Sequence, residues 1–498
     1  MKKNNKSYNQ ILKSTTIFGG SQVLVVLIGI IRTKIIAILL GTTGVGIIGI
    51  YYSIVDMVRS GAGLGIDTAG VREVAEVDSQ EDKTLLYKTI RRYNIWFKLT
   101  ALIGLLLCIA FCYPISVWAF GDNGYAFSIA CLSICVFCAI LTTGRSTLLQ
   151  GMRRISYLAK SNIIASIVSL IITIPLYSVW GIEAIAITFI LTYLASFICV
   201  EFYYRKLRIP KVDISIKESF RLGLKPLKLG FFIVIGGFIS TLSMFLVKAY
   251  ITRNIGIDAA GLFQSAWVIT NIYLGLILRS MGSDFFPRLS AIANDRSQVK
   301  TLVNEQSYVV LVIASPIIVG MLLFSNIAIS IFYSSEFAYA DTVLRWQILG
   351  TFFKVLSWPM AFIMLAKNKG FVYLFSEVLF YVVYLASTYL LFPKYGLDAT
   401  GIAYFIAYIV YLLIVFIISH KLTKFGWTKN IVLMTVVNIL LIGTAFFLSQ
   451  YSSDNIFLLS GIILFAISIL YGYYNLQQVF SLQELKDWFR KTPNNKSD

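Results

Sequence analysis

Charged residues are scarce in this sequence, at 13% of its 498 residues, about half the share of ordinary soluble domains. Histidine occurs once, at His420, and neither a Walker A motif nor a cluster of metal-ligating residues accompanies it. The sequence therefore predicts no metal centre, no nucleotide hydrolysis and no cofactor. Any energy input should then come from an ion gradient or from the gradient of the substrate itself.

Cysteine is also rare, and all six residues fall inside apolar runs. They are Cys108, Cys112, Cys131, Cys135, Cys138 and Cys199. Cys135 and Cys138 have C-x-x-C spacing, but no second pair or histidine lies in the same run. We expect these side chains to pack as small apolar groups between helices.

Long apolar runs, in contrast, recur along the chain, which is 58% hydrophobic with a mean hydropathy of +0.78. Runs of about 18 residues or more indicate transmembrane helices, and nothing alternates with the period of a membrane β-strand. We expect an all-α integral membrane protein with about 14 transmembrane helices. The first run, 17–40, is too long for a signal peptide and is expected to remain as a helix.

The net charge of +19 is distributed unevenly between the connections of these helices. Thirty-three Lys and Arg residues lie in one alternating set of connections, which includes both ends of the chain, whereas the other set holds only Arg253 and Lys394. This asymmetry predicts cytoplasmic termini by the positive-inside rule. The basic residues are thus a topology signal that calls for no nucleic-acid partner, although membrane lipids are expected partners.

An internal repeat divides the chain. "GTTGVG" at 41–46 and "GIDAAG" at 256–261 are 215 residues apart, as are "GIEA" at 181–184 and "GLDA" at 396–399. We therefore expect two parallel six-helix lobes, 1–215 and 216–429, around a central cavity. Residues 430–498 are expected to add helices 13 and 14 and a cytoplasmic tail.

Eight cations remain inside the expected helices, where each costs about 3 kcal/mol or more. They are Arg32, Lys34, Arg59, Lys98, Arg145, Lys248, Arg345 and Lys354. Arg32 and Lys248 occupy nearly equivalent positions of the repeat, 216 residues apart. Since guanidinium and ammonium groups both suit phosphate oxygens, these cations suggest a cavity for an anion.

The predicted anion-binding set consists of Arg32, Lys248, Arg59, Arg145 and Lys354. Two embedded carboxylates, Asp56 and Glu377, are candidates for ion coupling. An alternative for Arg59 is a structural bridge to Asp56, one turn earlier on the same face. For Lys34, Lys98 and Arg345, the alternative is extension of the side chain to a membrane interface.

Two stretches, "LLGTTGVGIIG" (39–49) and "GAGLGIDTAGVREVA" (61–75), resemble the O-antigen and polysaccharide-unit flippases of the multidrug/oligosaccharidyl-lipid/polysaccharide exporter superfamily. "LIGIIRTKIIAILLG" (27–41) also resembles the first helix of peptidoglycan-precursor flippases, whose motif arginine, matched by Arg32, lines a cationic cavity. The resemblance implies transport of an undecaprenyl-diphosphate-linked oligosaccharide from the cytoplasmic to the periplasmic leaflet of a bacterial inner membrane. The cations would bind the pyrophosphate, and helices 13 and 14 are candidates for a groove that holds the lipid tail.

Two other classes remain open. A multidrug exporter of the same superfamily would usually have twelve helices and acidic cavity residues. A membrane-embedded polysaccharide polymerase or glycosyltransferase would need catalytic residues on a long outer loop, and every expected outer loop here is short. The sequence therefore favours a transporter over an enzyme, with polysaccharide polymerase machinery as a candidate partner.

Overall fold

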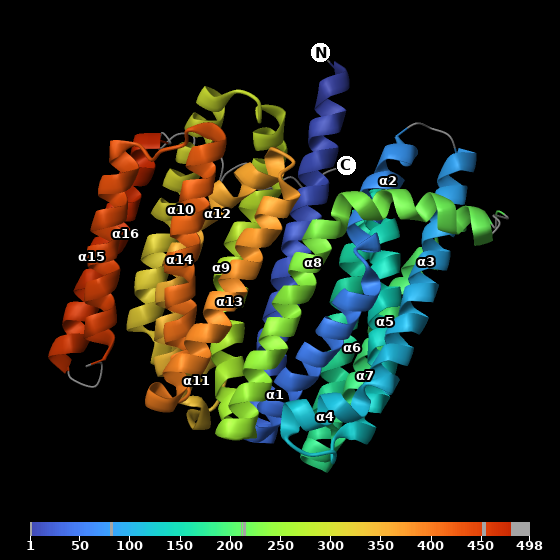
Figure 1. Ribbon diagram of the computed structural model, residues 1–498, viewed down its shortest axis with the longest axis horizontal. Coiled ribbons are helices and arrows are strands. Elements are labelled where there is room, and N and C mark those ends of the chain that lie inside the picture. Colours follow the sequence, from blue (N-terminus) through green and yellow to red (C-terminus); the bar gives the residue numbers. More distant parts are fainter. Residues whose placement is uncertain (1, 80–82, 211, 213–215, 451–454, 480–498) are drawn as a thin grey trace, which may run out of the picture. The chain divides into compact units, whose positions relative to one another are not determined.

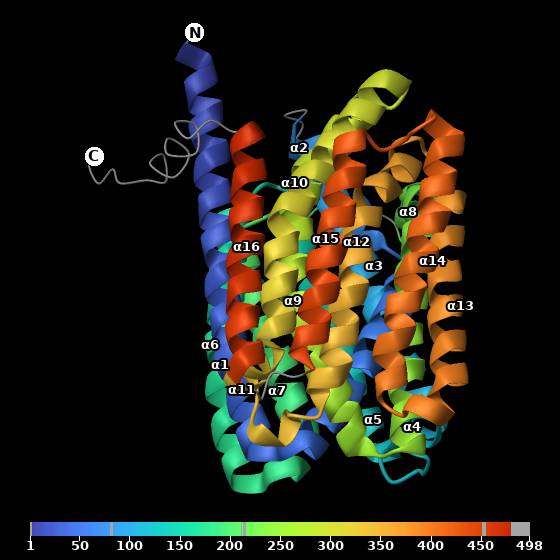
Figure 2. The same ribbon diagram turned by 90° about the vertical axis from the view of Figure 1, so that its left-hand side faces the viewer.

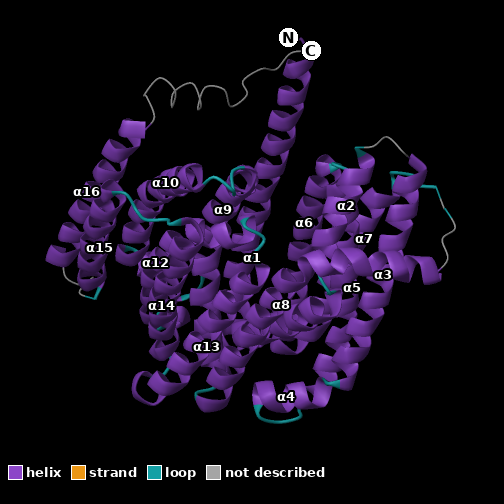
Figure 3. Cartoon of the chain, turned by 45° about the horizontal axis from the view of Figure 1, so that its top comes forward, coloured by secondary structure: helices purple, strands orange, loops and turns teal. Residues whose placement is uncertain are grey.

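The computed structural model describes residues 2–79, 83–210, 212, 216–450 and 455–479, and it is all-α across them, with no strand (Figure 3). Eleven stretches of the described residues are long and apolar enough to cross a membrane. The all-α membrane fold is thus confirmed, whereas the count of 14 stays a prediction. Two of the eleven stretches contain a helix break, at Gly41 and at Gly181.

The chain separates into two compact units. Unit 1 comprises residues 1–265 and 330–338, and unit 2 comprises residues 266–329 and 339–498. The lobes expected from the repeat, 1–215 and 216–429, stay a prediction.

The helices of unit 1 are α1 (Lys2–Gly63), α2 (Ile66–Asp78), α3 (Lys83–Ala110), α4 (Cys112–Phe120), α5 (Ala126–Gly151), α6 (Ile155–Trp180), α7 (Ile185–Arg205), α8 (Ile216–Asn254) and the first residues of α9 (Ile257–Ala291). The remainder of α9 belongs to unit 2. The other helices are α10 (Arg296–Leu323), α11 (Ser325–Phe332), α12 (Ala340–Ala366), α13 (Gly370–Tyr395), α14 (Asp398–Thr423), α15 (Lys429–Ser449) and α16 (Asn455–Val479).

Helix α1 reverses direction at Gly41. As one straight helix its 62 residues would measure about 93 Å, but Gly41 has φ 61° and ψ −164°, a conformation that is essentially restricted to glycine. In Figure 1 the chain descends from the N-terminus, turns at the lower end and returns towards α2. Residues 44–51 of the returning half are buried and form the centre of unit 1.

Two repeat-related glycines bring the returning half of α1 against the start of α9. A Cβ at Gly46 would lie 2.2 Å from the carbonyl oxygen of Ile257, and one at Gly261 would lie 2.0 Å from that of Thr42. The Thr42 hydroxyl also donates to Asp258 over 2.8 Å. Only residues without a side chain permit such a close approach of two backbones.

Helix α2 is an element that we did not expect, because 66–92 reads as a connection. Its buried residues Ile66, Gly70, Val74 and Val77 follow a helical spacing, which places one face against the unit. For the same reason α3 begins at Lys83, ten residues before the expected start.

Unit 2 is built around α12, which packs against α10, α13 and α14. Nearly every position of α12 between Val343 and Met364 is buried, so this helix is the core of the unit. Helices α15 and α16 pack against each other and against α10, as Figure 2 shows.

Candidate functional site

Arg32 lies on the first half of α1, inside a membrane-spanning stretch. Its Nε is buried and has no hydrogen-bond acceptor among the described residues. Lys34, two residues later, differs because its ammonium donates to the carbonyl oxygens of Ser330, at 2.5 Å, and Tyr333. Of the two cations in this stretch, Lys34 is therefore held by backbone within unit 1, whereas Arg32 keeps a buried donor available.

Arg59 lies on the second half of α1 and pairs with Asp56 over 3.1 Å. The bridge that the spacing suggested is thus present, but the two side chains are 40% and 45% exposed. An ion pair with this exposure contributes about 0–1 kcal/mol, and it uses one of five guanidinium donors. Arg59 also lines a cavity of about 200 Å³, together with Asp67 and Thr68.

Lys248 on α8 is almost completely buried, with an exposed fraction of 4%. Its ammonium donates to the carbonyl oxygen of Gly49, at 2.9 Å, and to the Ser53 hydroxyl, at 2.7 Å. The sequence placed this lysine in the anion-binding set. In the structure, its contacts tie α8 to the returning half of α1.

Arg145 on α5 is also engaged by the protein. Its Nε donates to Glu201 on α7 over 2.5 Å, another of its nitrogens donates to Asn94, and its guanidinium lies 4.4 Å from the Tyr204 ring. Sequence reasoning overlooked Glu201 as an embedded carboxylate, although the residue falls inside the helix expected at 181–204. Arg145 therefore joins three helices of unit 1.

Lys354 and Glu377 of unit 2 line a common cavity of about 280 Å³. The Lys354 ammonium lies 5.7 Å from the centre of the Tyr408 ring, and the Tyr411 hydroxyl donates to Glu377 over 2.7 Å. Further aromatic side chains complete the lining: Trp358, Phe362, Tyr373, Phe380 and Tyr381. The cavity thus combines one cation, one carboxylate and several aromatic rings, groups that can bind a polar ring by hydrogen bonds and by contact with its face.

The other embedded cations divide further. Arg345 pairs with Asp341 one turn earlier on α12, and its Nε donates to Ser325 over 3.2 Å, so it does not extend to an interface. The i, i+4 spacing of this pair is a signal that sequence reasoning missed. Lys98 is exposed on α3. Of the predicted set, Arg32, Arg59 and Lys354 remain available to a ligand, whereas Arg145 and Lys248 serve contacts within unit 1.

Comparison with known proteins adds the following matches. A family model described as "Polysaccharide biosynthesis protein" matches residues 35–341. A putative O-antigen transporter of Shigella flexneri is 25% identical over 383 residues, which cover 74% of this chain and 88% of that protein.

Two solved structures have a similar fold. A structure of the lipid II flippase MurJ in an inward closed conformation has a TM-score of 0.72 at 18% identity, covering 93% of this chain and 98% of that one. An inward-facing multidrug resistance MATE family transporter of the MOP superfamily has a TM-score of 0.65 at 15% identity, covering 82% and 96%. These likenesses show the fold.

Proposed function

The chain belongs to the polysaccharide biosynthesis protein family, and from this premise we propose that it is a flippase for a lipid-linked oligosaccharide. The substrate we propose is an undecaprenyl-diphosphate-linked O-antigen or similar repeat unit, moved from the cytoplasmic to the periplasmic leaflet of a bacterial inner membrane. Two similar proteins, one named a putative O-antigen transporter and one named a lipid II flippase, support this choice. Solved structures of the fold that are titled inward-facing and outward-facing support alternating access.

The observation that carries the proposal is the buried Nε of Arg32, which has no acceptor among the described residues. A cation in a membrane-spanning segment is costly, and a buried donor without a partner costs about 1–3 kcal/mol more. An anionic ligand removes both costs when it binds. A diphosphate offers several charged oxygens, which suit a guanidinium better than a neutral ligand does.

Within this proposal, Arg32 and Arg59 of unit 1 bind the diphosphate. The aromatic cavity of Lys354 in unit 2 binds sugar residues. Asp56 and Glu377 are the candidates for ion coupling, because protonation of either carboxylate would release a partner, Arg59 or Tyr411. Cytoplasmic termini and a polysaccharide polymerase as partner also belong to the proposal.

The proposal is tested with Arg32→Ala in cells that lack the chromosomal copy of the gene. Loss of a hydrogen bond to a charged group costs about 1.5–3 kcal/mol, so delivery of lipid-linked units per protein molecule should fall about 10- to 100-fold. Arg32→Lys should retain much of the activity, since an ammonium also binds phosphate. Surface glycan, normalised to membrane protein level, is the measurement.

Lys34→Ala is the matched control, because its ammonium is already bound to backbone carbonyl oxygens. This variant should lower the amount of protein while the activity of each molecule is kept. Normal export by well-expressed Arg32→Ala would refute the anion-binding role of Arg32.

A multidrug exporter is the second candidate, favoured by the TM-score of 0.65 to the MATE family transporter. Such a protein would lower the accumulation of cationic dyes in cells. We expect no change in dye accumulation when the gene is deleted, and instead an accumulation of lipid-linked glycan.

A further inference from the structure

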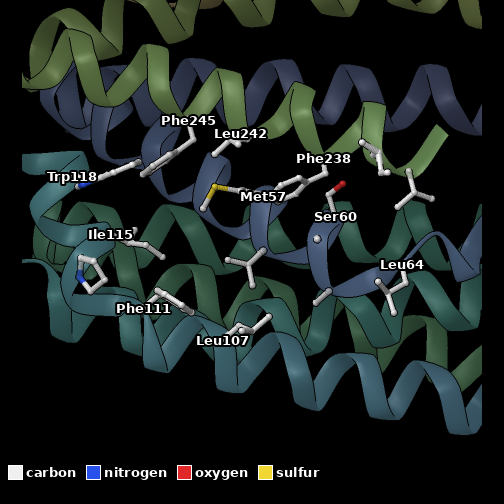
Figure 4. Close-up of a pocket in the computed structure, with 16 residues that line it drawn as sticks. Met57, Ser60, Leu64, Leu107, Phe111, Ile115, Trp118, Phe238, Leu242 and Phe245 are labelled. Atoms are coloured by element: carbon white, nitrogen blue, oxygen red, sulfur yellow. The ribbon is translucent and has the colours of Figure 1, made fainter. Parts of the chain in front are cut away.

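Unit 1 contains a second, larger cavity, of about 900 Å³, formed by the returning half of α1, the end of α3, α4 and α8. Figure 4 shows side chains from these helices facing one another across it, including Met57, Leu107, Phe238 and Phe245. Its lining is apolar apart from the Ser60 hydroxyl. None of the residues considered above for the diphosphate lines this cleft itself.

One end of the cleft adjoins the polar cavity that contains Arg59. Ser60 and Val234 line both spaces, so the two are neighbours within unit 1. At this end the junction of α1 and α2 is pressed against α8, since a Cβ at Gly65 would lie 1.9 Å from a methyl carbon of Val234. The apolar cleft therefore has a cation beside one end only.

The opposite end is open at the side of the unit. Phe111 and Trp118, which line the cleft there, are 54% and 57% exposed. Along α8 the lining runs from Val234 to Phe245, a length of about 16 Å at the helical rise of 1.5 Å per residue. The space is thus elongated, laterally open and polar at one end.

We propose that this cleft holds the polyprenyl chain of the lipid-linked substrate, with its diphosphate beside Arg59. The proposal rests on the proposed function and assigns the tail to unit 1, rather than to the α15–α16 groove that the family resemblance implied. In a bilayer, apolar contact alone does not favour one hydrocarbon over another, so selectivity must come from shape and from the charged end. A cavity of this volume is wider than one straight methylene chain requires, and it suits a methyl-branched chain.

Charge points to the same occupant. A diphosphate carries more negative charge than the single phosphate of a membrane phospholipid, and it therefore competes better for a guanidinium that already has Asp56 as a partner. The apolar cleft and Arg59 together form one site for a molecule that has a long branched chain on a multiply charged head.

The test uses the full chain in phospholipid nanodiscs, with undecaprenyl diphosphate as the probe. Photoreactive benzoylphenylalanine replaces Phe238 in one sample and Leu470 of α16, which is 65% exposed, in another. After irradiation, mass spectrometry identifies the attached lipid. We expect the polyprenyl adduct at position 238 and phospholipid adducts at position 470.

Two neighbouring residues of α3 provide the matched pair. Leu107→Trp fills the cleft opposite Phe238 and should lower the polyprenyl adduct about tenfold, whereas Leu106→Trp, outside the lining, should leave it unchanged. Phospholipid as the only adduct at position 238, or a polyprenyl adduct at position 470 alone, would overturn the proposal.

Glycan export separates this proposal from the proposed function. If Leu107→Trp abolishes the adduct but export remains normal, the cleft is not the site of the tail during transport, while the flippase proposal survives. If the wild-type protein supports no glycan export, the flippase proposal fails, whatever the adduct shows.

Discussion

The two units use the same backbone break and surround their embedded charges differently. Gly181, at the end of α6 in unit 1, has φ 54° and ψ −132°, and Gly396, 215 residues later at the end of α13 in unit 2, has φ 53° and ψ −130°. Yet unit 1 surrounds its cations with carboxylates, carbonyls and an apolar cleft, whereas Lys354 of unit 2 lies among aromatic rings. Helix geometry is thus repeated along the chain while the polar chemistry has diverged, which supports separate roles for the units in binding head group and sugars.

The largest effect is expected where repeat-related glycines meet. Gly46→Val would place side-chain atoms within 2.2 Å of the Ile257 carbonyl oxygen, and neither backbone can move away. The variant should not accumulate in the membrane, as measured by immunoblot. Gly29→Val, on the same helix with nothing within 4 Å of the added Cβ, should accumulate normally. Equal amounts of the two variants would show that the contact is not needed for folding.

A second comparison sets Arg145 of unit 1 against Lys354 of unit 2. Arg145→Ala leaves Glu201 largely buried with only Arg205 as a partner, and a broken buried pair costs about 3–5 kcal/mol. Thermal unfolding in detergent should therefore shift strongly downwards. Lys354→Ala should leave the midpoint nearly unchanged and reduce transport per molecule. The reverse pattern would remove the distinction between structural and substrate-binding cations.

The repeated break can be tested by a matched pair of substitutions. No atom lies within 4 Å of a Cβ built at Gly181 or at Gly396, so alanine at either site brings backbone strain alone. The expected loss is about 1–3 kcal/mol at each position, and the two losses should be similar. Unfolding midpoints of Gly181→Ala and Gly396→Ala check this equality, and a clearly unequal pair would argue against an equivalent role.

The smallest effect is expected at Tyr411. Tyr411→Phe removes the hydrogen bond to Glu377 and keeps the ring, so stability should fall by about 1 kcal/mol. If the cavity binds sugars, transport by Tyr411→Phe should be weakened less than by Lys354→Ala. A larger loss for Tyr411→Phe would place the centre of recognition at the Glu377 carboxylate.

The fold was predictable because apolar run length and glycine punctuation are local signals, and so the runs around Gly41 and Gly181 were placed correctly. The partners of the embedded cations were not predictable in the same way. Arg145 meets Glu201 across 56 residues of chain, and Lys248 meets a carbonyl oxygen of Gly49 that no side chain announces. Arg32, Arg59 and Lys354 could be named in advance because an embedded cation is conspicuous. Which of the set were already occupied depended on tertiary packing.

The lysine that ties α8 to α1 also bears on how the chain enters the membrane. During synthesis, an ammonium in the middle of an apolar helix opposes its transfer from the translocon into lipid by about 3 kcal/mol. The acceptors for this group, at Gly49 and Ser53, belong to a helix that leaves the ribosome some 200 residues earlier. Helix α8 therefore need not enter lipid alone, because it can partition directly onto an earlier helix whose oxygen atoms already await its charge.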